Sequence, residues 1–165
     1  MRVRGYRRRD FEFLSTAFQR YSVELARLDP FRRARPAPAL GTAYARSLLA
    51  RIRKRRGIFL LAEDESGEQM GFVAGGPAPL SSVQRMYFVR FTCPCTVEEL
   101  YVVPKFRRRG TGRRLLDEIE QRLGRRGYDW ISLETDPRNR PATRLYRSMR
   151  YKDIDWILGR PIRGH

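Results

Sequence analysis

The residue pattern with the clearest chemical potential is a glycine-rich turn that opens a helical pattern. Arginines crowd its start and two glycines close it, in the run Arg107, Arg108, Arg109, Gly110, Thr111 and Gly112, followed by Arg113. Glycines let a backbone approach a phosphate closely, and the first N–H groups and the positive end of a helix favour negative charge. We therefore predict an anion site here. The alternative is a tight strand-to-helix turn in an arginine-rich protein.

Two carboxylates and one phenol have side chains that suit proton transfer. Glu98 and Glu99 begin the strand pattern before the turn, and strand alternation predicts that they point to opposite faces. Pairing with the surplus arginines is the alternative for both. Tyr146 falls on an apolar helical face, so periodicity alone makes it a core residue. The sole histidine is His165, which argues against a histidine-based triad or metal site, and we expect no metal.

The overall composition fits one globular domain over residues 1–165. The chain carries 35 Lys plus Arg against 18 Asp plus Glu, a formal net charge of +17, and 41% apolar residues. No apolar run approaches the ~20 residues of a membrane span, so we expect a cytoplasmic protein with no membrane partner. All but three of the basic residues are arginines, spread along the chain. Nucleic-acid binding and an arginine-rich coding habit are the two interpretations of this surplus.

Hydrophobic periodicity predicts strands and helices that alternate along the chain. Helical spacing of apolar residues falls within 11–25, 44–52, 112–123 and 139–149. Strand patterns fall within 3–6, 58–62, 70–74, 83–91, 97–103, 130–135 and 151–158. These elements predict an α/β fold with six to seven strands and about four helices that cover both faces of the sheet.

A second motif lies one strand beyond the turn, and the two together resemble a known family. It runs from Asn139 to Tyr146 in the pattern N-x-x-A-x-x-L-Y. With the turn at 107–112, the strand at 100–102 and the order of the predicted elements, it resembles the GNAT superfamily of acetyl-CoA-dependent N-acetyltransferases. The resemblance covers nearly the whole chain and implies a mixed, mostly antiparallel sheet. One departure is Arg150, where the family usually has glycine.

The resemblance implies that acetyl-CoA is the cosubstrate and that several residues bind it. The turn at 107–112 would hold the CoA pyrophosphate through backbone amides. The backbone of one strand would pair with the pantetheine arm, at Leu100, Tyr101 and Val102. Two residues of the second motif would lie near the same arm, namely Asn139 and Ala142. These side chains and amides together form the implied cofactor site.

The same resemblance implies catalytic roles for a carboxylate and a phenol. An acceptor amine with a pKa of about 10 is mostly protonated at about pH 7, so a base must help to remove a proton before attack. The family often has an acidic residue two positions before its Leu-x-Val strand, which favours Glu98. Glu99 is the alternative base or a substrate-binding residue. Tyr146 matches the tyrosine that donates a proton to the departing thiolate.

We therefore expect an N-acetyltransferase that acetylates a primary amine, of a small molecule or a peptide, by direct attack in a ternary complex. A positive surface favours an acceptor that is acidic or carries phosphate. Many family members form dimers, so the resemblance is compatible with a homodimer. The alternative from another class is a basic module that keeps this fold but binds nucleic acid or the ribosome without transferring acetyl groups.

Overall fold

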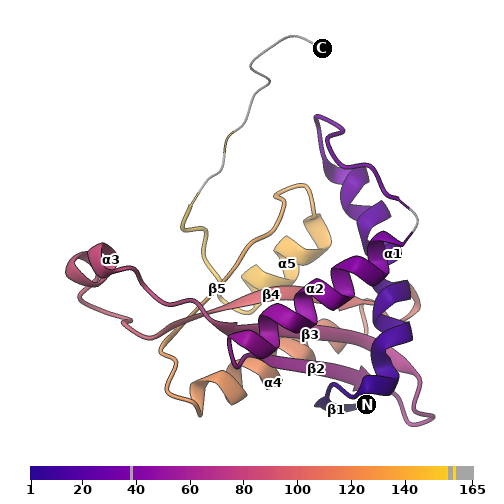
Figure 1. The fold of residues 1–165 in the computed structure, drawn as a ribbon, viewed down its shortest axis with the longest axis horizontal. Coiled ribbons are helices and arrows are strands. Elements are labelled where there is room, and N and C mark those ends of the chain that lie inside the picture. The colour runs from indigo at the N-terminus through magenta and orange to yellow at the C-terminus, as the bar shows by residue number, and fades with distance from the viewer. Residues whose placement is uncertain (38, 156–157, 159–165) are drawn as a thin grey trace.

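The fold is organised around a mixed sheet (Figure 1). The computed structural model describes residues 1–37, 39–155 and 158, and their strands lie in the order β1-β2-β3-β4-β5. The strands are β1 (Arg2–Gly5), β2 (Ile58–Glu63), β3 (Gln69–Pro77), β4 (Pro94–Val102) and β5 (Trp130–Leu133). All neighbours are antiparallel except β4 and β5, which are parallel. The mostly antiparallel sheet is confirmed, but the predicted count of six to seven strands is wrong, because the described residues form five.

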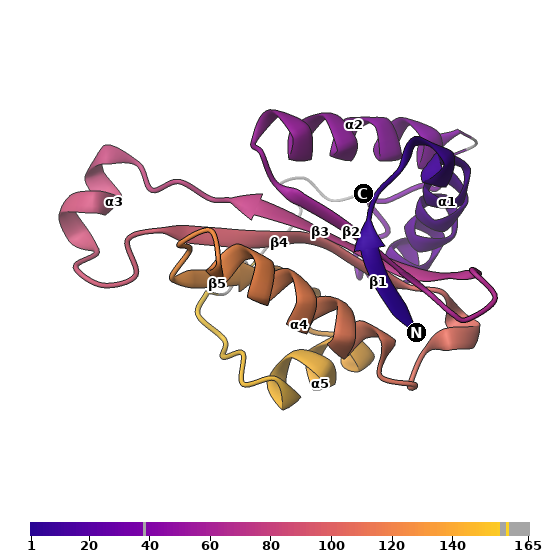
Figure 2. The same cartoon turned by 90° about the horizontal axis from the view of Figure 1, so that it is seen from below.

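Helices cover both faces of this sheet (Figure 2). The described residues form α1 (Phe11–Leu28), α2 (Leu40–Lys54), α3 (Ser82–Tyr87), α4 (Thr111–Gly124) and α5 (Arg140–Ser148). In the view of Figure 2, α1 and α2 lie above the sheet and α4 and α5 lie below it. None of the described helices combines the length and the apolar character needed to cross a membrane.

The sheet separates two hydrophobic cores, as strand alternation requires. Beneath α1 and α2 the buried residues include Leu14, Phe18, Leu48, Phe72 and Tyr101. Beneath α4 they include Leu60, Val73, Val97, Leu115 and Ile119, with Leu145 and Tyr146 of α5 packed against them. Both β3 and β4 contribute side chains to each core, so these two strands are held from above and below.

Two predicted strands are not strands in the described residues. The segment 83–91 was predicted as extended, but it contains most of α3. The Ser81 hydroxyl accepts a hydrogen bond from the Gln84 N–H at 3.2 Å, and the Gln84 side chain accepts one from the Ser81 N–H at 2.9 Å. This reciprocal capping starts a helix locally and outweighs the strand-like composition. The final strand at 151–158 is absent from 151–155 and 158, and 156–157 lie outside the described residues.

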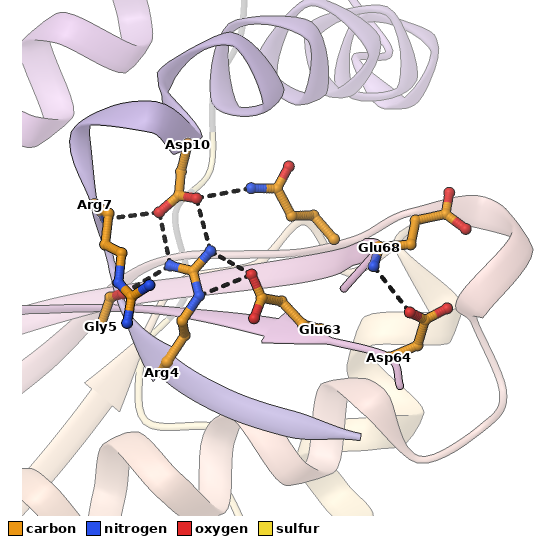
Figure 3. Close-up of polar contacts among 8 residues, drawn as sticks. Arg4, Gly5, Arg7, Asp10, Glu63, Asp64 and Glu68 are labelled. Carbon is orange, nitrogen blue, oxygen red and sulfur yellow. Dashed lines mark hydrogen bonds and ion pairs between the residues drawn. The ribbon is translucent and has the colours of Figure 1, made fainter. Parts of the chain in front are cut away.

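A buried arginine ties the N-terminal segment to the sheet (Figure 3). Arg4 of β1 donates hydrogen bonds of 2.8 and 2.7 Å to the fully buried carboxylate of Asp10, and its Nε donates one of 2.8 Å to Glu63 of β2. Asp10 also accepts from the Arg7 N–H at 2.6 Å and from the Gln69 side chain of β3 at 2.9 Å. This cluster fixes the start of α1 against three strands.

The ion cluster makes stability depend on pH. Burial alone would raise the pKa of the Asp10 carboxyl, but hydrogen bonds from Arg4, the Arg7 N–H and Gln69 outweigh it and hold that pKa below its usual value. A hydrogen bond from Arg4 is the main reason that the pKa of Glu63 is also lowered. A carboxyl with a lowered folded-state pKa stabilises the fold above its unfolded pKa, and this contribution is lost as pH falls through the folded pKa.

Asp10→Asn should therefore lower the free energy of unfolding by about 3 kcal/mol at neutral pH, because Arg4 would remain charged and buried with one carboxylate fewer. Urea unfolding followed by circular dichroism measures this difference, which should shrink as pH is lowered from about 4 toward about 2. Asp136→Asn is the matched control. It removes the charge of a partly exposed pair with Arg138 and should cost less than about 1 kcal/mol. Equal costs for the two variants would contradict this account.

Candidate active site

The candidate site is built on β4, which loses one neighbour partway along its length. On one side β4 pairs with β3 over nearly its whole length. On the other side it pairs with β5 only from Pro94 to Val97, and Val97 lies opposite Leu133, the last residue of β5. Within the described residues, the edge of 98–102 that faces β5 has no strand partner. Backbone N–H and C=O groups require partners, so this edge suits an extended ligand.

The three predicted cofactor-strand residues lie on this edge. Leu100 and Val102 pack against the core beneath α4, and Tyr101 is buried in the core beneath α1 and α2. Their side chains therefore hold β4 from both faces while its backbone edge stays open. The Tyr101 hydroxyl is buried and has no hydrogen-bond partner among the described residues.

A β-bulge brings the two candidate glutamates to the same helix. Ala74 of β3 lies opposite Glu99, whereas Gly75 lies opposite Val97, so Glu98 is an extra residue in β4. Such a bulge breaks the alternation of side chains. The prediction that Glu98 and Glu99 point to opposite faces is therefore wrong, because both side chains contact α2.

The two glutamates have different partners on α2. Glu98 is paired with two arginines, Arg51 at 3.1 Å and Arg55 at 3.4 Å. Glu99 instead accepts a short hydrogen bond from the Tyr44 hydroxyl. The Arg51 guanidinium also lies over the Tyr44 ring, 6.0 Å from its centroid. Glu98 therefore belongs to an ion-pair cluster with two arginines. Among the described residues, the side-chain hydrogen bond of Glu99 comes from the neutral hydroxyl of Tyr44.

The surroundings of Glu99 make its carboxyl a weaker acid. Burial raises the pKa of the Glu99 carboxyl, and although Tyr44 and Arg51 oppose this, the pKa remains above its ordinary value. Burial, followed by the hydrogen bond to Glu99, raises the pKa of Tyr44 to about 12. A carboxyl with a raised pKa binds a proton more readily near neutral pH, which suits a general base.

Tyr146 of α5 lies in the electrostatic range of Glu99. Burial raises the pKa of Tyr146 to about 12, and the negative charge of Glu99 contributes to this rise. The phenol is therefore protonated at neutral pH. The helix that carries it is capped by Asn139, whose side chain accepts a hydrogen bond of 3.4 Å from the Ala142 N–H. Asn139 and Ala142 thus set the start of α5 and with it the position of Tyr146.

The glycine-rich turn forms the N-terminus of α4. Gly110 precedes this helix with a φ of 81°, and no side chain caps the first turn of α4. The Thr111 hydroxyl is buried and donates a hydrogen bond of 3.2 Å to the carbonyl of Phe106, which fixes the turn. At Gly112 a Cβ would lie 3.0 Å from the Leu145 side chain, so this glycine permits close packing of α4 and α5. The N–H groups of this first turn can therefore donate hydrogen bonds to an anion.

The predicted arginines of the turn divide into two kinds. Arg107 donates a hydrogen bond of 2.8 Å to the Val102 carbonyl and pairs with Glu24 of α1 at 2.7 Å. Arg113 donates to the Ser148 hydroxyl at 2.7 Å and thereby joins α4 to α5. The side chains of Arg108 and Arg109 are exposed and make no hydrogen bond or ion pair with the described residues. These two arginines have the freedom to contact an anion at the turn.

Sequence reasoning missed the contribution of α1 and α2. Tyr44 and Arg51 fall within the helix predicted at 44–52, and nothing in their spacing linked them to Glu98 or Glu99. Tyr21 of α1 falls within the helix predicted at 11–25, and burial and the charge of Glu99 both raise its pKa. Contacts between residues about 50 positions apart leave no local signal. Among the described residues, no group of three or more His, Cys, Asp or Glu side chains could hold a metal ion.

Comparison with known proteins points to one family. A family model described as "Acetyltransferase (GNAT) family" matches residues 21–151. The chain is 34% identical over 107 residues to the Bacillus subtilis protein named "Uncharacterized N-acetyltransferase YhfO", covering 64% of this chain and 66% of that protein. It is 34% identical over 110 residues to a Schizosaccharomyces pombe protein named "Uncharacterized N-acetyltransferase C1271.07c", covering 64% and 58%. The aligned part thus spans less than two thirds of either relative.

Solved structures share the fold at lower identity. A predicted acetyltransferase from Clostridium acetobutylicum, solved with acetyl-CoA, matches 98% of this chain and 96% of its own with a TM-score of 0.70 and 15% sequence identity. A putative acetyl transferase from Pyrococcus furiosus matches 98% and 99%, with a TM-score of 0.74 and 20% identity. The fold is therefore shared over nearly the full length. Because the family model covers well over half of the sequence, the chain belongs to the GNAT family of acetyltransferases.

Proposed function

We propose that this protein transfers the acetyl group of acetyl-CoA to a primary amine by direct attack in a ternary complex. The observation that carries the proposal is the open edge of β4 at 98–102, which leads toward the uncapped N-terminus of α4. An extended amide-containing arm can pair with the edge, and a diphosphate can meet the helix amides. Acetyl-CoA has both groups and supplies a reactive thioester.

The residues of this chain fit such a ligand at both ends. At the phosphate end, Gly110 allows close backbone approach, and Arg108 and Arg109 are available for its charge. At the opposite end of the edge, Glu99 and Tyr146 lie near the bulge. The phosphates would thus be held away from the carboxylate and the phenol, which avoids repulsion between the anions.

We assign the role of general base to Glu99 in place of Glu98. A base must give up its own partners to accept a proton, and Glu98 is held in ion pairs with two arginines. Glu99 has a raised pKa and a neutral partner in Tyr44, so it accepts a proton from an ammonium group more readily. The proton moves to Glu99, directly or through water, and the neutral nitrogen then attacks the thioester carbonyl.

Tyr146 completes the reaction as the proton donor. Its phenol stays protonated because burial raises its pKa, and it donates that proton to the leaving thiolate. The nitrogen loses a second proton once its bond to the acetyl carbon has formed, and this proton restores the phenol. Glu99 releases the first proton to water. A cysteine intermediate is not needed in this sequence of steps. Cys95 is buried, donates a hydrogen bond to the Trp130 carbonyl at 3.1 Å, and has its thiol pKa raised to about 11 by burial, so it is a poor nucleophile.

Gly110→Glu should abolish acetyl-CoA binding or weaken it by at least about tenfold, because a side chain and a negative charge would occupy the anion site. Isothermal calorimetry with the wild-type protein and the variant measures the effect. Gly67→Glu is the matched control, since Gly67 has a φ of 85°, has open space beside its Cα like Gly110, and lies in the turn between β2 and β3, outside the helix start that forms the anion site. Its binding should be unchanged.

The wild-type protein must itself bind acetyl-CoA for this proposal to stand. If it does not, the acetyltransferase proposal is wrong, and salt-dependent binding of the arginine-rich surface to RNA or DNA becomes the function to measure. Equal loss of binding in both glycine variants would show that strain, and not the anion site, is responsible.

Glu99→Gln should lower kcat by about 100-fold or more at about pH 7, because the acceptor ammonium would lose its base. The deficit should narrow toward about pH 10, where the amine deprotonates without help. Glu98→Gln removes a charge from the adjacent position and should change kcat by less than about threefold, within the range of a lost surface ion pair. The measurement is the pH dependence of kcat with a reactive amine, for the wild-type protein and for both variants. A larger deficit in Glu98→Gln would assign the base to Glu98.

A further inference from the structure

A projecting arm between β3 and β4 is not needed for any step above. The arm comprises residues 78–93 and contains α3, and both views show it extending past the sheet and away from the other helices (Figures 1 and 2). Its base is anchored. The Asp129 carboxylate accepts hydrogen bonds from the N–H groups of Thr92 at 3.0 Å and Cys93 at 2.9 Å, and the Ala78 N–H donates to the Pro94 carbonyl at 3.0 Å.

The arm exposes an unusual number of large apolar side chains. Four of them are between 71% and 87% exposed, namely Val83, Met86, Tyr87 and Val89. Phe88 and Phe91 are about half exposed, and the Phe91 ring lies 5.2 Å from the ring of Trp130 on the body of the protein. The apolar surface therefore continues from the tip of the arm to its base.

A continuous exposed apolar surface of this kind marks an interaction site. The largest apolar patch on a typical monomer is roughly 300–600 Å². An aromatic side chain alone offers roughly 150–250 Å². The three aromatic and three aliphatic side chains of the arm can thus form the apolar part of the ~800 Å² that each partner gives to an interface of standard size. A helix of six residues such as α3 is also marginal alone and gains stability when its apolar face is covered.

The charge of the arm indicates which partner covers it. Arg85 and Arg90 are its only charged residues, whereas 32% of the whole chain is charged. The Nε of Arg85 is turned back onto the arm, where it donates to the Leu80 carbonyl at 3.3 Å. An acidic partner would bind better elsewhere on this chain of net charge +17, because the arm carries only two cationic side chains. A charge-poor apolar surface is matched best by another of the same kind.

We propose that two copies of this chain associate through their arms. Among the described residues, the other exposed large apolar side chains are scattered over the two ends of the chain, α1, the segment after it, α2 and β5, so the arm of a second copy is the matching surface. Contact between identical patches gives a closed two-fold dimer. Because the arm projects, the two positively charged bodies of the dimer lie apart. Salt then screens most of the repulsion between them.

Sedimentation velocity over about 1 to about 100 µM protein tests this proposal. The wild-type protein should show a species of twice the 19.5 kDa chain mass, and raising NaCl from about 0.15 to about 0.5 M should strengthen it by screening like charges. The double variant Met86→Glu, Val89→Glu should raise the dissociation constant by about 100-fold or more. Both side chains are exposed, so the variant should fold. Ile154→Glu, at an exposed apolar residue outside the arm, is the control and should leave the dimer intact.

Acetyl-CoA binding by calorimetry is measured on the same samples. It should be unchanged in the double variant, because the arm holds no residue of the candidate active site, so failure of the dimer and failure of the proposed reaction are seen separately. A wild-type protein that stays at the mass of one chain at the highest concentration in both salts would overturn the proposal. So would a dimer that persists in the double variant, or association seen only with an acidic protein or with anionic vesicles.

Discussion

The open edge of β4 is the constraint on which the rest of the structure depends. A strand that gives up one neighbour exposes backbone groups that would otherwise be paired, and it would tend to twist or fray. Here β3 pairs with β4 along its length, and side chains such as Tyr101 and Val102 anchor it in cores on both faces. Arg107 adds a hydrogen bond to the carbonyl of Val102. The edge is therefore open and rigid, as a preorganised binding surface should be.

Several arginines have defined partners in the fold. Arg4 holds the buried carboxylate of Asp10, Arg51 and Arg55 hold Glu98, and Arg113 joins α4 to α5. In the bulge, this leaves two adjacent glutamates with opposite properties. Glu98 is engaged in ion pairs with two arginines, and Glu99 is left with a tyrosine and a raised pKa. The fold thus separates a structural carboxylate from a reactive one without changing the residue type.

Local patterns predicted what local chemistry decides. Apolar spacing predicted α1, α2, α4 and α5, and glycines with positive φ, such as Gly110, marked the turn. The sequence could not show the bulge, because the register of β4 is set by Gly75 and Ala74 across the sheet. Nor could it show α3, since the capping by Ser81 and Gln84 competes with a strand-like composition. Arg150, where the resemblance implies a glycine, adopts a φ of 69°, in the left-handed region that favours glycine.

Hydrogen exchange with and without acetyl-CoA tests the central claim most directly, because it reports on individual backbone amides. The account predicts slower exchange on binding at two places, the β4 edge within 98–102 and the start of α4 within 110–113, with no change in the arm at 78–93. Protection that is absent from both places, or that appears only between α1 and α2, would contradict the claim that the open edge of β4 and the turn before α4 form the cofactor site.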